Sequence, residues 1–130
     1  MILNFNSLKP IYLQIAEGIE DDIVQGILRE GESSYSQLTI SKELNVNPAT
    51  AAKGINVLVQ KGILEKQRGL SMVVAAGARE RLWTEKRQNH IYILSAELVR
   101  ESRKIGMSRE SVMNLLNKIY DIGEEPEKNE

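Results

Sequence analysis

The stretch that decides the fold is NVNPATAAKGINVLVQKG, which runs from residue 45 to residue 62. Asn47 is a residue type that caps helix starts, Pro48 suits the first helical position, and Gly62 suits the position just past the last turn. Between them, apolar residues recur at helical spacing and predict one buried stripe. These residues are Ala51, Ile55, Leu58 and Val59. The sequence therefore predicts a short helix whose other face begins with small, uncharged side chains.

Two helices are predicted ahead of this one. Over residues 10–28, isoleucine recurs at every fourth position, which indicates a strongly amphipathic helix. Its stripe consists of Ile11, Ile15, Ile19, Ile23 and Ile27. A second, short helix would be capped by Ser34 or Ser36 and would end before a tight connection, because the residue before Pro48 disfavours helical geometry. Its inward-facing residues would be Leu38, Ile40 and Leu44.

The pattern changes after Gly62. Two strands are predicted over residues 63–68 and 71–74, because short apolar and β-branched runs flank a turn signal. Gly69 and Leu70 would form that turn, since glycine at the first of two turn positions suits a type II′ hairpin.

Two further helices are predicted behind the hairpin, one over residues 79–104 and one that begins after Ser108. The preceding order of helix, short helix, tight turn, helix and hairpin describes a winged helix-turn-helix. We therefore expect a mainly α-helical fold with a small β-hairpin. The predicted parts are a winged helix-turn-helix domain over residues 1–76, a two-helix region over residues 77–122 and a disordered acidic tail over residues 123–130.

Composition excludes several classes of protein. The 130 residues contain no cysteine, which excludes disulfides, thiolate metal sites and cysteine nucleophiles. No apolar run is long enough to cross a bilayer and nothing resembles a signal peptide, so a cytoplasmic protein is expected. The net charge is −1, but residues 9–41 hold two cations and six acids, whereas residues 42–74 hold five cations and two acids. A surface that faces a polyanion would explain this asymmetry, and so would two ordinary solvated surfaces.

Residues 9–75 closely resemble the winged-helix domain of GntR-family transcriptional regulators. The motifs that carry the resemblance are Pro10-Ile11-Tyr12, Gly26 ahead of Gly31, Leu44-x-Val46-Asn47-Pro48-x-Thr50, Leu58-x-x-x-Gly62-Ile63-Leu64 and Arg68-Gly69-x-x-Met72-x-Val74. The helices after the wing, with GARERLWTEKRQN at the joint, are similar to the YtrA-type subfamily. The resemblance implies a homodimeric DNA-binding regulator, typically a repressor and often of a transporter operon, with no enzymatic activity and no cofactor.

The chain departs from the family pattern at positions that usually carry arginine. Family members commonly read Leu-Pro-Ser-x-Arg before the second helix, and here Tyr35 stands at the proline position and Leu38 at the arginine position. A basic pair is common at the start of the third helix, and here Ala52 takes one of its places. The usual operator of the family therefore cannot be assigned to this chain.

The residues expected to contact DNA follow from how a winged helix docks. Its third helix lies in the major groove with its N-terminal residues at the base edges. Small residues there can lie against thymine methyl groups, and polar ones can hydrogen-bond bases or phosphates. The predicted set is Ser36, Gln37, Asn47, Ala49, Thr50, Ala52, Lys53, Arg68 and Gly69. The alternatives are helix capping for Ser36 and Asn47, an ordinary early-helix role for Thr50, and solvated surface charge for Lys53 and Arg68.

Dimerisation is expected because one subunit offers few cations to phosphate. Two copies on a two-fold axis would double these contacts and read an inverted repeat in double-stranded DNA. The apolar residues predicted to form the dimer interface are Leu82, Ile91, Leu94, Leu98, Val112, Leu115, Leu116 and Ile119. A small-molecule effector would need a cleft between the subunits, since the appendage is too small to enclose one.

Two other classes of function are weighed against this interpretation. The missing arginines and the acidic isoelectric point favour a winged helix that has diverged to bind protein or RNA. An enzyme is disfavoured, because His90 has no metal-ligand spacing to Glu85 or Glu97 and no phosphate loop, nucleophile elbow or metal site is present. Trp83, beside the joint, either packs that joint or lines an effector pocket.

Overall fold

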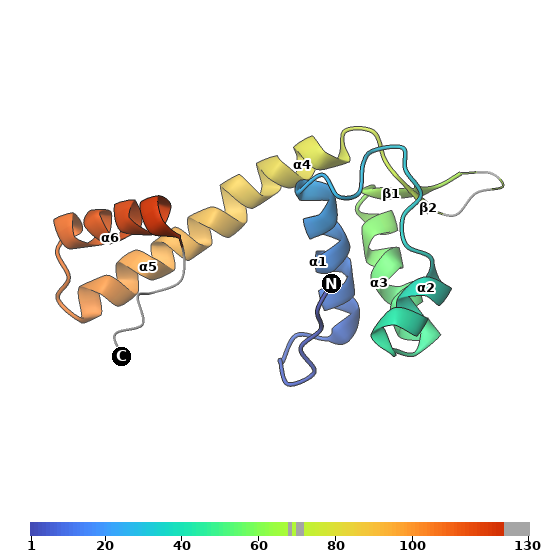
Figure 1. Ribbon diagram of the computed structural model, residues 1–130, viewed down its shortest axis with the longest axis horizontal. Coiled ribbons are helices and arrows are strands. Elements are labelled where there is room, and N and C mark those ends of the chain that lie inside the picture. Colours follow the sequence, from blue (N-terminus) through green and yellow to red (C-terminus); the bar gives the residue numbers. More distant parts are fainter. Residues whose placement is uncertain (68, 70–71, 124–130) are drawn as a thin grey trace. The chain divides into compact units, whose positions relative to one another are not determined.

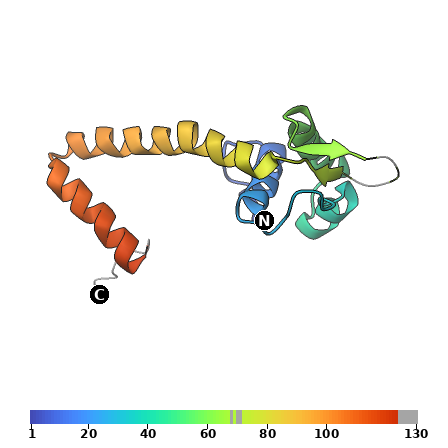
Figure 2. The same ribbon diagram turned by 90° about the horizontal axis from the view of Figure 1, so that it is seen from above.

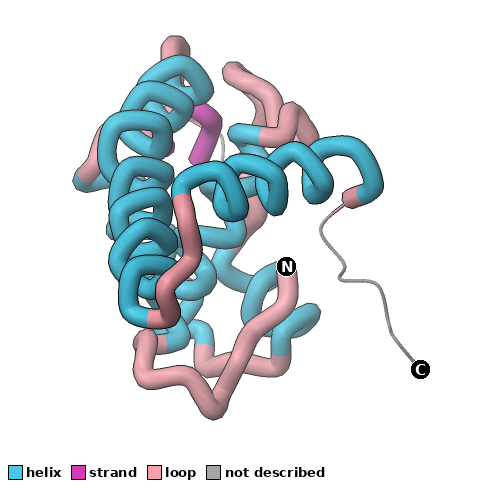
Figure 3. The backbone as a smooth tube through the Cα atoms, turned by 90° about the vertical axis from the view of Figure 1, so that its left-hand side faces the viewer, coloured by secondary structure: helices cyan, strands magenta, loops and turns pink. Residues whose placement is uncertain are grey.

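The computed structural model describes residues 1–67, 69 and 72–123. The chain divides into two compact units, Met1–Glu85 and Lys86–Glu130. Helices α1 to α4 and both strands lie in the first unit, whereas η1, α5 and α6 lie in the second (Figure 1). Figure 3 shows that helices make up most of the described chain. Residues 124–130 of the predicted acidic tail lie outside the described residues.

Helix α1 spans Ile11–Val24 and supplies the centre of the first unit's core. Its fully buried side chains include those of Ile15, Ile19 and Ile23, as the four-residue repeat predicts. The helix ends four residues before the predicted end, because the chain turns away at Gly26, whose φ of 81° is accessible mainly to glycine. The prediction was therefore wrong for Ile27, which is exposed rather than part of the stripe.

Helix α2 spans Gln37–Leu44 and is capped by Ser36, whose Oγ accepts a hydrogen bond from the amide of Thr39 (3.0 Å). Ile40 is buried in the core, as predicted. Leu38, however, is 67% exposed, so the expectation that it faces inward was wrong. It lies two residues before Ile40, and residues two apart on a helix point in very different directions.

Helix α3 spans Pro48–Gln60 and follows α2 after three residues, the first of which, Asn45, is left-handed (φ 53°). The predicted cap is confirmed: Asn47 Oδ1 accepts a hydrogen bond from the amide of Ala49 (2.8 Å). Gly54 allows α3 to pack closely on α1, because a Cβ at this position would lie only 2.8 Å from the carbonyl oxygen of Tyr12. The buried residues of α3 are Ala51, Gly54, Ile55 and Leu58.

The wing is an antiparallel hairpin of β1 (Leu64–Lys66) and β2 (Met72–Val74). Leu64 pairs with Val74 and Lys66 with Met72. The described strands are shorter than predicted, and residues 68, 70 and 71 of the predicted hairpin lie outside the described residues.

Helix α4 spans Ala78–Glu85 and closes the first unit. Leu82 is only 1% exposed and belongs to the same core as α1 and α3. This packing places α4 in the first unit, whereas the sequence predicts a boundary after residue 76. The core of this unit consists of Ile15, Ala16, Ile19, Ile23, Leu28, Ile40, Ala51, Ile55, Leu58, Ile63, Leu64, Val74, Ala75, Ala78 and Leu82.

The second unit begins with a π-helical segment, η1, which spans Lys86–Ile91. Helices α5 (Tyr92–Lys104) and α6 (Arg109–Ile122) follow it. The continuous α-helix predicted over residues 79–104 is therefore divided, because six residues adopt the wider and rarer π geometry. The predicted start of α6 is confirmed by Ser108, whose Oγ accepts a hydrogen bond from the amide of Ser111 (3.1 Å).

Helices α5 and α6 splay apart from their connection (Figure 2) and leave a cleft of about 460 Å³ between them. Leu98, Val112 and Leu116 line this cleft. In residues 86–123, the described part of the second unit, no hydrophobic side chain is buried. Among the described residues, no helix has the length and apolar character of a membrane span.

Candidate nucleic-acid interface

One face of α3 is open to solvent while the opposite face packs on α1. Ala49, Lys53, Asn56 and Gln60 are exposed and recur at three- or four-residue spacing, which places them on one side of the helix. Ala52 lies on the same side and is half-buried. The open face therefore offers small side chains near the start of the helix and amides further along it, a combination able to approach base edges.

The structure places three of the predicted polar residues at the starts of α2 and α3. Ser36 Oγ both accepts from the Thr39 amide and donates to Thr39 Oγ1 (2.8 Å), and Asn47 Oδ1 accepts from the Ala49 amide. Thr50 is half-buried in the first turn of α3. The capping alternative thus accounts for the side-chain oxygens of Ser36 and Asn47, while contact with DNA stays a prediction for all three residues.

Lys53 is held against α1. Its Nζ atom lies 4.1 Å from the centroid of the Tyr12 ring, a cation–π contact worth about 0.5–1 kcal/mol at an exposed site. The side chain is exposed, so the ammonium group remains available to solvent. A phosphate contact by Lys53 therefore competes only with a weak interaction.

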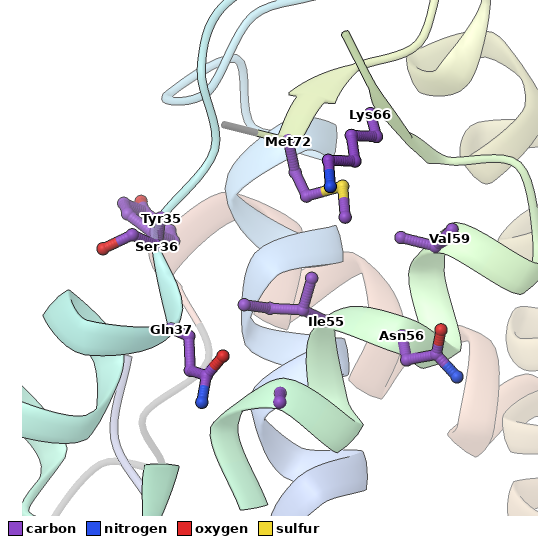
Figure 4. Close-up of a pocket in the computed structure, with 9 residues that line it drawn as sticks. Tyr35, Ser36, Gln37, Ile55, Asn56, Val59, Lys66 and Met72 are labelled. Carbon is purple, nitrogen blue, oxygen red and sulfur yellow. The ribbon is translucent and has the colours of Figure 1, made fainter. Parts of the chain in front are cut away.

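A cavity of about 480 Å³ lies between the start of α2, the middle of α3 and the wing (Figure 4). Ile55, Val59 and Met72 give it apolar walls, and Gln37, Asn56 and Lys66 add polar groups. The cavity thus brings predicted residues from two helices together with residues of the wing. Its complete lining is Tyr35, Ser36, Gln37, Ala52, Ile55, Asn56, Val59, Lys66 and Met72.

Sequence reasoning missed Asn56 and Lys66 in this surface. Asn56 lies one helical turn beyond Ala52, so the periodicity used for the buried stripe already places it on the open face. Lys66 is the last residue of β1 and is exposed next to buried Leu64 and exposed Glu65. Both residues lie away from the start of α3 and the tip of the wing, the two places where a winged helix is expected to contact DNA.

The tip of the wing is only partly described. Gly69 is exposed and has a φ of 77°, and a Cβ at this position would meet nothing within 4 Å. Arg68, the predicted wing cation, lies outside the described residues. Gly69 thus has the positive φ expected of a glycine in this turn.

Tyr35 occupies the position where the family commonly has proline. Its hydroxyl donates a hydrogen bond to the Asp22 carboxylate on α1 and so ties the chain before α2 to the core. This hydrogen bond, the burial of the phenol and the negative charges of Asp22 and Glu43 together raise the pKa of Tyr35 to about 12. A side-chain hydrogen bond of the tyrosine therefore restrains this part of the chain, where a proline would restrict the backbone itself.

Trp83 and His90 are the two residues that the sequence analysis weighed for an effector pocket and for a metal site. Trp83 belongs to the first unit, where its Nε1 donates a hydrogen bond to the carbonyl oxygen of Val24 (3.2 Å). His90 is exposed in η1, and no group of three or more potential metal ligands occurs among the described residues.

The residues predicted for a dimer interface are exposed or half-buried in the second unit, with one exception. The prediction was wrong for Leu82, because its burial in the core of the first unit leaves its side chain unavailable to a partner subunit. The others are Ile91, Leu94, Leu98, Val112, Leu115, Leu116 and Ile119.

Similar proteins agree with this architecture, although no family model matches the chain. The chain is 28% identical over 109 residues to the HTH-type transcriptional regulator YhcF of Bacillus subtilis, covering 84% of this chain and 88% of that protein. It is 25% identical over 113 residues to the HTH-type transcriptional repressor YtrA of Bacillus subtilis, covering 87% and 86%.

A solved structure extends the similarity to the three-dimensional fold. A GntR family transcriptional regulator from Listeria monocytogenes matches with a TM-score of 0.71 and 25% identity, covering 88% of this chain and 98% of that one. These matches span both units of the chain, and the proteins named are DNA-binding regulators rather than enzymes. The chain is therefore a winged-helix transcriptional regulator that resembles the GntR family and its YtrA-like members.

Proposed function

We propose that the protein is a homodimeric repressor that binds an inverted-repeat operator with the open face of α3 and the wing, and that residues 86–122 of the second unit serve mainly for dimerisation. The observation that carries the proposal is the contrast between a first unit with a buried core and a second unit whose described apolar side chains are all exposed or half-buried. The repressor role is supported by the similarity to the repressor YtrA, and control of a transporter operon is the family's common use. Because the DNA target lies there, the cytoplasm is the proposed location.

The dimer is supported by the unsatisfied apolar surface of the second unit. Helices in water owe most of their stability to packing of an apolar face, and apolar surface of this extent marks an interaction site. The exposed apolar side chains of η1, α5 and α6 are Ile91, Tyr92, Ile93, Leu94, Val99, Met113, Leu115, Ile119, Tyr120 and Ile122. A second copy is the natural occupant, since a two-fold axis pairs such a patch with itself.

The mode of readout is supported by the chemistry of the open face of α3. Ala49 and Ala52 are small enough to lie against thymine methyl groups, and the Asn56 amide can donate to and accept from adenine. Lys53 and Lys66 supply charge for phosphates. With so few cations in each subunit, we expect a shallow dependence of affinity on salt.

The proposal is tested by a gel-shift experiment at low salt with the duplex upstream of the protein's own gene. We expect specific retardation below micromolar protein, with two subunits on each duplex. No specific retardation at micromolar protein would contradict the proposal. Preferential binding of an RNA of the same sequence would favour a diverged RNA-binding module.

A variant tests the readout separately. Ala52→Arg restores arginine where the family usually has it, and we expect a changed base preference as well as a changed affinity. A uniform gain on every sequence would mean that this position faces only phosphate. Binding to a library of randomised duplexes distinguishes the two results.

A further inference from the structure

Helix α4 lies beside the C-terminal end of α1 (Figure 1). Two of its side chains bond the last carbonyl of that helix. Arg79 Nε donates a hydrogen bond to the carbonyl oxygen of Val24, the last residue of α1 (3.1 Å), and Trp83 Nε1 donates to the same oxygen (3.2 Å). The guanidinium carbon of Arg79 lies 4.5 Å from the centroid of the Trp83 ring. One carbonyl at the end of α1 therefore receives two donors from one helix.

The same helix contacts the C-terminal end of α3, the proposed recognition helix. Arg81 Nη2 donates to the carbonyl oxygen of Lys61 (2.7 Å), the C-cap of α3, and Arg81 Nη1 donates to that of Gly62 (3.2 Å). The last carbonyls of a helix lack partners within it and carry partial negative charge. Neither α1 nor α3 has a basic residue in its last turn, and the arginines of α4 place positive charge at both helix ends.

Two glycines make room for these arginines. Gly26 and Gly62 have positive φ values of 81° and 74°, as expected just past helix ends. A Cβ at Gly26 would also lie 3.2 Å from the guanidinium of Arg79, and one at Gly62 would lie 3.2 Å from that of Arg81. The backbone thus leaves space for each guanidinium close to the end of its helix.

An ion network reinforces the junction. Lys61 Nζ lies 2.8 Å from Glu20 Oε2 on α1 and 3.6 Å from Glu85 Oε1 on α4, and the Glu20 side chain is buried. Burial alone would lower the pKa of Lys61, but the hydrogen bond and the charge of Glu20, with those of Glu85, raise it above its ordinary value. Charged side chains therefore join the same three helices that the arginines join.

We propose that Arg79 and Arg81 are positioning residues that fix the orientation of α4 against the ends of α1 and α3, and thereby set the spacing between operator half-sites. Helix α4 is the last element of the first unit, and η1 of the second unit follows it directly. In a dimer held by the second unit, the separation of two recognition helices depends on the orientation of α4 against α3. This inference rests on the proposed dimer.

A direct contact with DNA does not explain these arginines. Arg81 is engaged at the C-terminal end of α3 and Arg79 at the C-terminal end of α1, whereas a recognition helix presents its N-terminal residues to the bases. With 13 residues, α3 separates its two ends by about 20 Å. Their effect on DNA binding should therefore act through geometry rather than through charge.

The experiment compares operators of different spacing. A high-affinity duplex is selected from a random library with the full-length protein, and duplexes are made with one or two base pairs added to or removed from its centre. Dissociation constants are measured for the wild type, Arg79→Gln, Arg81→Gln and the double variant. Glu80→Gln, an exposed residue between the two arginines, is the matched control.

We expect the wild type and Glu80→Gln to prefer the selected spacing at least tenfold over a change of one base pair. The arginine variants should reduce that preference to threefold or less, while the salt dependence and the dimer remain unchanged. General loss of stability would weaken binding at every spacing alike and would leave the preference intact. Arg81→Lys keeps the charge but not the two-pronged contact, so we expect an intermediate preference.

Three results would overturn the inference. One is an unchanged spacing preference in the double variant, and another is an equal loss at all spacings with a smaller salt slope, which would indicate phosphate contacts. The third applies if circular dichroism shows that the double variant does not fold. In that case, an unchanged spacing preference in both single variants would overturn the inference. Failure of the proposed function is distinguishable, because the wild type itself would then select no duplex or would bind as a monomer.

Discussion

The two units of this protein satisfy their apolar side chains in different ways. The first unit buries a continuous core that draws on α1, α2, α3, the wing and α4, and Ile15, Leu58 and Leu82 are almost wholly removed from water. In the described part of the second unit, the apolar side chains of α5 and α6 remain exposed or half-buried. We infer that the first unit is stable by itself, whereas the second derives its stability from association.

The largest expected effect tests the first half of this comparison. Leu58→Ala removes a fully buried side chain from the core, so we expect the free energy of unfolding to fall by about 3–4 kcal/mol. Urea unfolding followed by circular dichroism measures this change. The loss should not depend on protein concentration. Leu115→Ala, at a site 40% exposed in the second unit, is the matched control and should show its effect only as a dependence on concentration.

The second prediction concerns association. Leu116→Glu places a charge in the cleft between α5 and α6, so we expect loss of the dimer and a fall in operator affinity of about 100-fold, because linked half-sites no longer bind together. Sedimentation velocity and gel shift measure the two effects. Asn114→Glu adds the same charge at an exposed position of α6 and should leave both unchanged. A variant that remained dimeric would remove the second unit from the interface.

A smaller effect is expected on the DNA-facing surface of the first unit. Asn56→Ala should weaken operator binding by about 1–3 kcal/mol and relax preference at one base position, without changing the salt slope. Competition binding with single-base variants of the operator measures this. Lys66→Gln should instead weaken binding to all sequences alike and reduce the salt slope by about 1. Identical behaviour of the two variants would contradict base recognition by Asn56.

The smallest effect concerns pH and the link between α1 and α2. The pKa of Tyr35 is about 12 in the folded chain and close to 10 when unfolded, so its hydrogen bond stabilises the fold below pH 10 and is lost as pH rises from 10 to 12. Tyr35→Phe should cost about 1 kcal/mol at pH 7. Unfolding measured at several pH values should show the difference between wild type and variant shrinking above pH 10. A constant difference would mean that the hydrogen bond does not contribute.

Many of the helix starts could be predicted because their signals are local. A cap depends only on a side chain and an amide two or three residues later. The caps at Asn47 and Ser108 form as predicted, and Ser36, one of the two predicted candidates, caps α2. Ile27 and Leu38 were misassigned because an apolar residue beyond a helix end, or on its outer face, looks the same in sequence as one in the stripe.

What the sequence by itself determined was the order of elements, the caps, the buried stripe of α3 and the kind of surface that α3 leaves open. Periodicity and capping depend on residues that are close together in the sequence, so they can be predicted from it directly. Only the tertiary structure decided that Leu82 belongs to the first core, that Asn56 and Lys66 meet at one cavity, and that α4 caps two other helices. These contacts involve residues up to 59 positions apart in the sequence. They depend on the packing of distant surfaces, which no local sequence pattern encodes.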